Sequence, residues 1–182
     1  MKKIAGLSFA VLLVSLVFSF NALAMDYQHS MELKDMNFSW SIENDLIHVK
    51  LSAKTTGWVA VGFNPEKAML HANIIIGYVK KGKVKIEDHF GNRKRGHSKD
   101  KKEGGKNDIQ NPAGTEENGF TTLTFTIPLD SGDKTDGVIK ADGSNILIFA
   151  YGGKRDSTKS RHNYRSTYSV NLKTGENKRI TK

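Results

Sequence analysis

The sequence of 182 residues contains no cysteine. A chain without thiols forms no disulfide, no thiolate zinc site and no iron–sulfur cluster, and it cannot attach a cofactor through a Cys-x-x-Cys-His sequence. Its stability must come from strand pairing, core packing or a bound group. Any cofactor of this protein is therefore expected to be held without a covalent bond.

Long apolar runs are also scarce, and the clear one lies at the N-terminus. Lys2 and Lys3 precede an apolar run over residues 4–20, and the small residues Ala22 and Ala24 follow it. This is the pattern of a secretory signal peptide, and the run is shorter than the roughly 20 residues of a membrane-spanning helix. We expect cleavage after residue 24 and secretion into the bacterial periplasm, with an uncleaved membrane anchor as the alternative.

The remaining residues 25–182 suit one domain of ordinary size. No later stretch is apolar enough to span a bilayer, so we expect no stable membrane span after the signal peptide is removed.

Acidic residues are in the minority. Lysine and arginine number 28 against 19 aspartates and glutamates, a formal net charge of +9, and the two lysines of the signal peptide account for 2 of these charges (9 − 2 = +7). Such an excess attracts acidic proteins or anionic envelope polymers. The alternative is a solvated basic surface with no partner. We expect no nucleic-acid partner.

Helical periodicity is almost absent, and period-two alternation replaces it. Residues 38–42 and 47–53 alternate around a turn at residues 43–45, which predicts a hairpin. Further strands are predicted over residues 58–63, 72–79, 83–90, 121–127, 146–151 and 164–172. A short helical turn is predicted at residues 65–70. These strands predict an all-β fold, an antiparallel immunoglobulin-like β-sandwich.

Two polar stretches separate the predicted strands. Residues 91–119 contain almost no apolar side chain, and we interpret them as a long, mobile, solvated loop. Residues 130–143, rich in Asp, Gly and Lys, predict a second polar loop.

The order of landmarks resembles the DOMON domain family over residues 35–172. The resemblance rests on the segments GWVAVGF at 57–63 and ANIIIGY at 72–78, with Met69 between them, and on a following hairpin that ends in Asp88. It continues through TFTIPL at 124–129, with Asp133 and Asp136 after it, LIFAYG at 147–152, and His162.

The resemblance implies a cofactor, because cytochrome members of this family ligate one non-covalent haem b through a methionine and a histidine at these places. Carried over, the iron ligands are Met69 and His162. An iron with both ligands has no vacant position, so the protein is expected to carry electrons to or from an acidic redox partner and not to be an enzyme.

The residues themselves leave alternatives open. Met69 lies in a polar-flanked loop, where a flexible thioether can also plug the end of a core. His162 lies among Lys159, Arg161 and Asn163, the setting of an ordinary exposed histidine. His71 is the rival ligand, since it lies two residues from Met69.

Aromatic and basic residues near these ligands are candidates for the rest of the site. Phe63, Tyr78, Tyr151 and Tyr164 either flank the porphyrin or pack in the core. Lys154 and Arg161, with Lys67, Arg155 and Arg165, are candidates to pair with the propionates or to raise the reduction potential.

Other functions have weaker support. A haem-free module that binds a sugar or another small ligand is the alternative, with Trp58, Tyr78 and Tyr151 as stacking surfaces. His89 and His97, with Asp88 and Asp100, match no particular metal site. Asp130, Asp133 and Asp136 lack the loop length and closing glutamate of an EF-hand, which favours a solvated turn. No hydrolytic or nucleotide-binding motif occurs.

Overall fold

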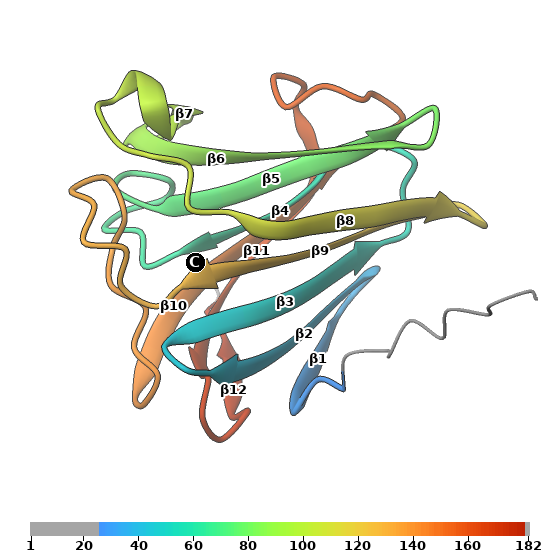
Figure 1. Ribbon diagram of the computed structural model, residues 1–182. Coiled ribbons are helices and arrows are strands. Elements are labelled where there is room, and N and C mark those ends of the chain that lie inside the picture. Colours follow the sequence, from blue (N-terminus) through green and yellow to red (C-terminus); the bar gives the residue numbers. More distant parts are fainter. Residues whose placement is uncertain (1–25, 181–182) are drawn as a thin grey trace, which may run out of the picture.

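The computed structural model describes residues 26–180, and the predicted signal peptide lies outside the described residues. Two antiparallel sheets pack face to face (Figure 1). The strands of the five-stranded sheet are, in spatial order, β1 (His29–Leu33), β2 (Met36–Glu43), β3 (Leu46–Ala53), β9 (Phe120–Pro128) and β8 (Gln110–Glu117). The predicted β-sandwich is confirmed.

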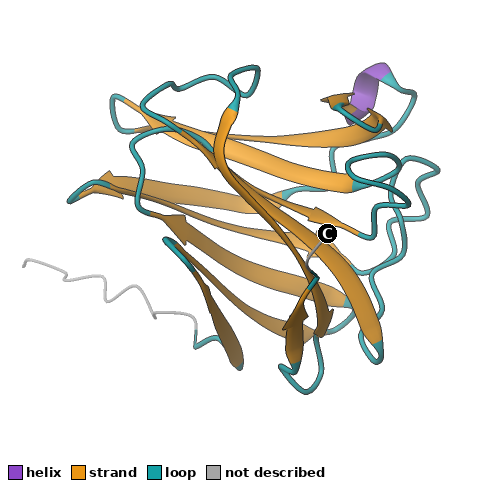
Figure 2. Cartoon of the chain, turned by 180° about the vertical axis from the view of Figure 1, so that it is seen from behind, coloured by secondary structure: helices purple, strands orange, loops and turns teal. Residues whose placement is uncertain are grey.

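The second sheet has seven strands. In spatial order they are β12 (Asn177–Arg179), β11 (His162–Asn171), β10 (Ser144–Gly152), β4 (Val59–Phe63), β5 (Asn73–Lys80), β6 (Lys83–Arg93) and β7 (Gly96–Lys99). A 3-10 turn, η1 (Asp100–Lys102), follows β7 at the edge of this sheet (Figure 2).

Tight turns fix the register of the hairpins. Asn44 and Asp45 between β2 and β3 have φ angles of 48° and 62°, and Lys81 and Gly82 between β5 and β6 have φ angles of 49° and 73°. Two successive positive φ angles define the type I′ turn, whose twist matches that of paired strands. The predicted hairpin at residues 38–53 is therefore correct, with Glu43 paired to Leu46.

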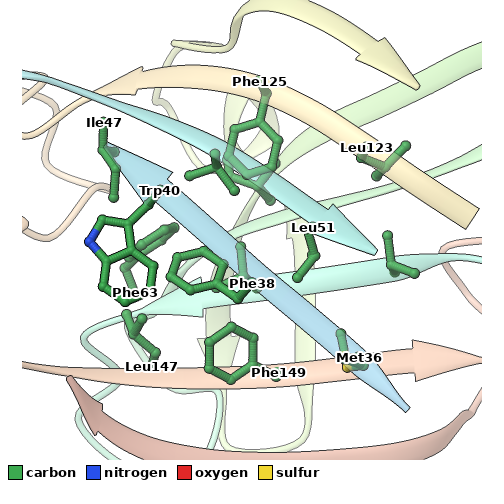
Figure 3. Packing of buried hydrophobic residues seen from close by; sticks show 14 of the residues in the cluster. Met36, Phe38, Trp40, Ile47, Leu51, Phe63, Leu123, Phe125, Leu147 and Phe149 are labelled. Atoms are coloured by element: carbon green, nitrogen blue, oxygen red, sulfur yellow. The ribbon is translucent and has the colours of Figure 1, made fainter. Parts of the chain in front are cut away.

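One core fills the space between the sheets. Trp40 and Phe38 of β2 stack with ring centroids 5.0 Å apart, and the edge of Phe149 from β10 meets Phe38 at 5.2 Å. The Trp40 Nε1–H group donates a 2.8 Å hydrogen bond to the carbonyl of Leu172, so the one polar atom of this indole is satisfied. Figure 3 shows these aromatic side chains pointing toward one another from opposite sheets.

Two local predictions are wrong. Residues 65–70 form no helical turn, because Ala68 and His71 take φ angles of 58° and 62° and a single bridge joins Lys67 to Leu70. Residues 91–119 are not a plain loop, since β7, η1 and β8 lie within them. Backbone pairing of β8 with β9 orders this polar chain without burying side chains.

Candidate functional site

The outer face of the seven-stranded sheet is apolar along β4, β5 and β10, although no second sheet formed by residues 26–180 covers it. Along β4 and β5 the side chains alternate: Val61 and Ile75 point into the sandwich, whereas Ala60, Ile74 and Ile76 point outward. The outward residues are nonetheless buried, between 2% and 7% exposed. With Trp58, Ala72 and Tyr78 they form a second apolar cluster, here called the outer cluster.

The outer cluster is covered by the connection between β10 and β11, residues 153–161, here called the covering segment. The Trp58 Nε1–H group donates a 2.8 Å hydrogen bond to Ser160 Oγ, and Thr158 Oγ1 lies 3.3 Å from the Glu87 carboxylate on β6. The covering segment contains no strand or helix. Two side-chain hydrogen bonds therefore tie an irregular segment across an apolar face.

Met69 lies at one end of this face, in the connection between β4 and β5. Its side chain is partly buried and packs against the outer cluster. The backbone is held by Ala72, whose N–H group donates a 3.1 Å hydrogen bond to the Met69 carbonyl. A Cβ at Gly91 would fall on that carbonyl, so the loop reaches this position only because residue 91 is glycine.

His162 is the first residue of β11 and is exposed. It pairs with Gly152, whose missing Cβ points at the Trp58 indole, 2.6–2.7 Å from two ring carbons. Because paired residues of antiparallel strands share a face, His162 lies on the same outer face as Trp58.

The two predicted iron ligands therefore lie on the same face of the seven-stranded sheet but at opposite ends of the outer cluster. The pairing order places Met69 beside Ala72 and His162 at the level of Tyr78. At about 3.4 Å per residue, those six steps along β5 correspond to roughly 20 Å. Trp58 lies at the His162 end, since Val59 pairs with Gly77 and with Tyr151.

Three of the predicted flanking aromatics face the other way. Phe63 and Tyr151 belong to the core between the sheets, and Tyr164 packs against that core and stacks on Tyr151 with centroids 5.4 Å apart. The Tyr151 hydroxyl group donates a 3.1 Å hydrogen bond to Asp35. Side chains alternate between the two faces along a strand, and these three aromatic residues occupy positions that face the interior of the sandwich. Tyr78 is the one member of this set on the outer face.

The predicted basic residues gather near the His162 end. Lys154 and Arg161 are exposed residues of the covering segment, and Arg165 of β11 pairs with Ala150 on the outer face. Lys67 is exposed in the Met69 loop at the opposite end.

His71, the rival ligand, is turned away from the outer cluster. Its Nδ1 lies 2.8 Å from the Glu66 carboxylate, its ring stacks on Phe90 at 5.8 Å, and its side chain is 56% exposed. The positive φ angle of 62° at this residue separates its direction from that of Met69.

A buried polar group that was not predicted from the sequence borders the outer cluster along β6. The Glu87 carboxylate lies 2.7 Å from Lys99 Nζ, 3.2 Å from Lys85 Nζ and 3.2 Å from His89 Nε2. Burial alone would raise the pKa of Glu87, yet hydrogen bonds from these three groups outweigh burial and lower it to about 2.

Hydrogen bonds link the side chains of Glu87, His89 and His97 in that order. The two histidine Nδ1 atoms lie 2.8 Å apart. Burial, followed by repulsion from His89, lowers the pKa of His97 to about 4, and burial lowers that of His89 as well. Both imidazoles are therefore neutral near pH 7, and the Nδ1–H group of one donates a hydrogen bond to Nδ1 of the other.

The residues present fit a haem in their chemistry. Thioether and imidazole donors flank a flat apolar face of aliphatic and small side chains, and cationic residues stand at its rim. The fit requires that the covering segment move aside, because its Ser160 is hydrogen-bonded to Trp58 and its Thr158 to Glu87 across the face.

Comparison with known proteins identifies the family to which this chain belongs. The model of the DOMON domain family matches residues 32–152. The chain belongs to the DOMON domain family. Met69 lies within the matched range, and His162 lies beyond it.

Curated relatives of this DOMON domain are much longer proteins. Human DBH-like monooxygenase protein 1 is 32% identical over 112 residues, which are 62% of this chain and 18% of that protein. MOXD1 homolog 2 of Drosophila melanogaster is 26% identical over 133 residues, 69% of this chain and 16% of that protein. The chain spans less than a fifth of the length of these relatives.

Among solved structures, the cytochrome b domain of pyranose dehydrogenase from Coprinopsis cinerea has a similar fold. The TM-score is 0.56 at 13% identity, over 77% of this chain and 78% of that chain. At this identity the likeness concerns the fold alone. Within residues 26–180, no helix is long and apolar enough to cross a membrane.

Proposed function

We propose that this DOMON domain binds one haem b without a covalent bond and carries single electrons, with Met69 and His162 as the iron ligands. The observation that carries the proposal is the outer cluster: an apolar face closed by an irregular segment, with a thioether at one end and an imidazole at the other. The cytochrome b domain with the same fold adds support.

In this proposal each residue has a separate task. Met69 and His162 would supply the thioether and imidazole donors that hold the iron. Ala60, Ile74 and Ile76 provide an apolar floor that excludes water. Haem bound this way supplies one-electron redox chemistry, and a methionine ligand raises its reduction potential relative to two histidines.

The covering segment is the part that must rearrange. It begins beside Gly152 and ends at His162, so lifting it from Trp58 uncovers the floor and frees the histidine to turn inward. The displacement breaks the Trp58–Ser160 and Thr158–Glu87 contacts. The neutral Trp58–Ser160 hydrogen bond contributes about 0.5–1.5 kcal/mol, and the hydrogen bond from Thr158 to the ionised Glu87 carboxylate contributes about 1.5–3 kcal/mol.

We further propose that the protein acts in the periplasm as an electron carrier and not as an enzyme. The pattern of residues 1–24 supports export, and the net charge of +7 without that segment (9 − 2 = +7) supports an acidic redox partner. The names of the curated relatives include a monooxygenase, but the matched segment is less than a fifth of those proteins.

Titration of the purified protein with haemin, followed by absorption spectroscopy of the oxidised and reduced forms, tests the proposal. We expect a one-to-one complex with the spectrum of a six-coordinate low-spin haem. Met69→Ala and His162→Ala should each convert it to a five-coordinate or weakly bound form.

His71→Ala is the matched control, because His71 is exposed and points away from the outer cluster. It should leave the spectrum unchanged. A complex that survives both ligand substitutions, or no complex at all, overturns the assignment. In the second case a haem-free module for a sugar or another small ligand gains support, and a rise in melting temperature with a glycan would identify it.

A further inference from the structure

Five aspartates converge at the end of the sandwich where the Met69 loop also lies. Asp88 comes from β6, Asp100 from the start of η1, Asp108 from the connection to β8, and Asp133 and Asp136 from the connection between β9 and β10. Carboxylate oxygens of Asp88, Asp108 and Asp136 lie within 4.8 Å of one another, and so do those of Asp100, Asp133 and Asp136. Asp136 joins the two groups.

Several of these oxygens are buried without a partner. Asp88 Oδ1, Asp108 Oδ2, Asp136 Oδ1 and both carboxylate oxygens of Asp100 accept no hydrogen bond from the described residues. Asp100 is 0% exposed and Asp88 is 5% exposed. The ion pairs found within residues 26–180 include none of these four aspartates.

Such an arrangement is unfavourable for the protein alone. A buried carboxylate without a counter-charge costs several kcal/mol, and like charges at this distance add repulsion. Burial and neighbouring carboxylates raise the pKa of Asp88 to about 8 and that of Asp136 to about 7. A cation placed among these oxygens removes both costs.

A neutral side chain beside the cluster points to the same conclusion. Asn73 of β5 is 5% exposed, and its Oδ1 accepts no hydrogen bond from the described residues. Asn73 pairs with Phe90 and Ile75 pairs with Asp88, so Asn73 and Asp88 are diagonal neighbours on one face. The Asn73 amide oxygen is therefore a further buried oxygen beside the cluster that could bind a cation.

The backbone is shaped around the cluster. A Cβ at Gly105 would fall on the Asp100 carboxylate and the Thr135 hydroxyl group, so only glycine fits there. The backbone N–H groups of Lys106 and Asp108 donate hydrogen bonds to Asp133 and Asp88, at 2.7 and 3.2 Å. These contacts hold the loops in place and leave the unpaired oxygens facing one another.

We propose that Asp88, Asp100, Asp108 and Asp136 bind one calcium ion, with Asn73 and Asp133 beside them. All donors are oxygens, which excludes a preference for zinc or copper. Calcium accepts six to eight oxygens at 2.3–2.6 Å in irregular geometry, whereas magnesium demands an octahedron and retains water. Donors drawn from four separate segments suit the larger, more tolerant ion.

Calcium would join β6, η1 and the two polar connections, so it should stabilise the fold. In the purified protein treated with EDTA and then titrated with CaCl2, we expect calorimetry to show one bound ion per chain. At about 100-fold excess over the dissociation constant, the melting temperature should rise by about 5–10 °C. Equimolar MgCl2 should give a smaller rise.

Asp100→Asn and Asp136→Asn should abolish the calcium-dependent rise. Asp130→Asn is the matched control, because Asp130 is an exposed aspartate of the same connection outside the cluster. Each of these two variants removes a negative charge that repels its neighbours. Its melting temperature in EDTA should therefore be no lower than that of the wild type. This comparison distinguishes a loss of calcium binding from a loss of folding.

Two results would overturn the proposal. One is no heat and no change in melting temperature up to about 10 mM CaCl2, above the roughly 0.1–1 mM range of extracellular calcium modules. That result would mean that shared protons alone neutralise the cluster. The other is a calcium response that persists unchanged in both cluster variants.

Discussion

On the outer face, four positions of β4 and β10 are important because their residues are small. Gly62, Gly152, Ala60 and Ala150 leave room on β4 and β10 where larger side chains would stand. A Cβ at Gly152 would meet the Trp58 indole, which reaches Ser160, and a Cβ at Gly62 would meet Ile148 and Ile74. The face is therefore smooth because of composition at four positions, not because of a separate structural element.

Replacing Gly152 by alanine tests this packing. The new Cβ would lie 2.6–2.7 Å from two carbons of the Trp58 ring, so the indole must shift and lose its contact with Ser160. We expect a loss of about 1–3 kcal/mol in the free energy of unfolding, measured by urea denaturation. Gly137→Ala is the control, since its Cβ would meet nothing closer than 3.9 Å. Equal stability of the two variants would refute the packing argument.

At the scale of elements, Glu87 connects parts that are not neighbours in sequence. Its carboxylate receives Lys85 from its own strand, Lys99 from β7 and Thr158 from the covering segment. The edge strand β7 and the covering segment therefore share one buried anion. Loss of its charge should loosen both.

Glu87→Gln tests that connection through pH. The ordinary pKa of this carboxyl group is 4.5 and its pKa in the folded protein is about 2, so its ionised form stabilises the fold above pH 4.5. That stability is lost as the pH falls from about 4.5 to about 2. The variant should lose about 1–3 kcal/mol at pH 7 and lack this part of the acid transition, as measured by melting temperature against pH.

Glu116→Gln, on the exposed face of edge strand β8, is the control and should change neither quantity by more than about 0.5 kcal/mol. If Glu87→Gln retained the acid transition of the wild type, the ion pairs at Glu87 would not contribute to stability.

Sequence patterns predicted most strands with a buried face, except β1 with its buried Met31 and Leu33, and missed the strands without one. The alternation in β2 and β3 is visible because the core requires every second residue to be apolar. The strand β8 has the sequence QNPAGTEE, which is exposed almost throughout, and only its backbone pairing with β9 makes it a strand. Short edges such as β12 carry no apolar signal for the same reason.

Sites were predictable only where landmarks lie close in sequence. Met69 follows a recognisable strand, and its place in the chain indicates its place in the fold. The aspartates at 88, 100 and 136 gave no combined signal, because their proximity depends on how β6 and the β9–β10 connection meet. The covering segment was unpredictable too, since side-chain hydrogen bonds with Thr55, Trp58 and Glu87 define its path.

At the scale of the whole molecule, pairing links distant parts of the chain. The strand β3 pairs with β9, and β4 pairs with β10, so each sheet combines early and late segments. The core contains residues of both sheets, among them Trp40 from one and Phe149 from the other. Neither half of the sequence forms a closed core alone, which predicts a single cooperative unfolding transition.

The two tryptophans make this prediction measurable on each side of the seven-stranded sheet. Trp40 is fully buried in the core between the sheets, whereas Trp58 lies on the outer face beneath the covering segment. In Trp58→Phe the fluorescence reports the core, and in Trp40→Phe it reports the outer face. For each variant in urea, we expect the fluorescence midpoint to coincide with that of far-ultraviolet circular dichroism. An earlier fluorescence transition confined to Trp40→Phe would mean that the covering segment opens as a separate unit before the strands part.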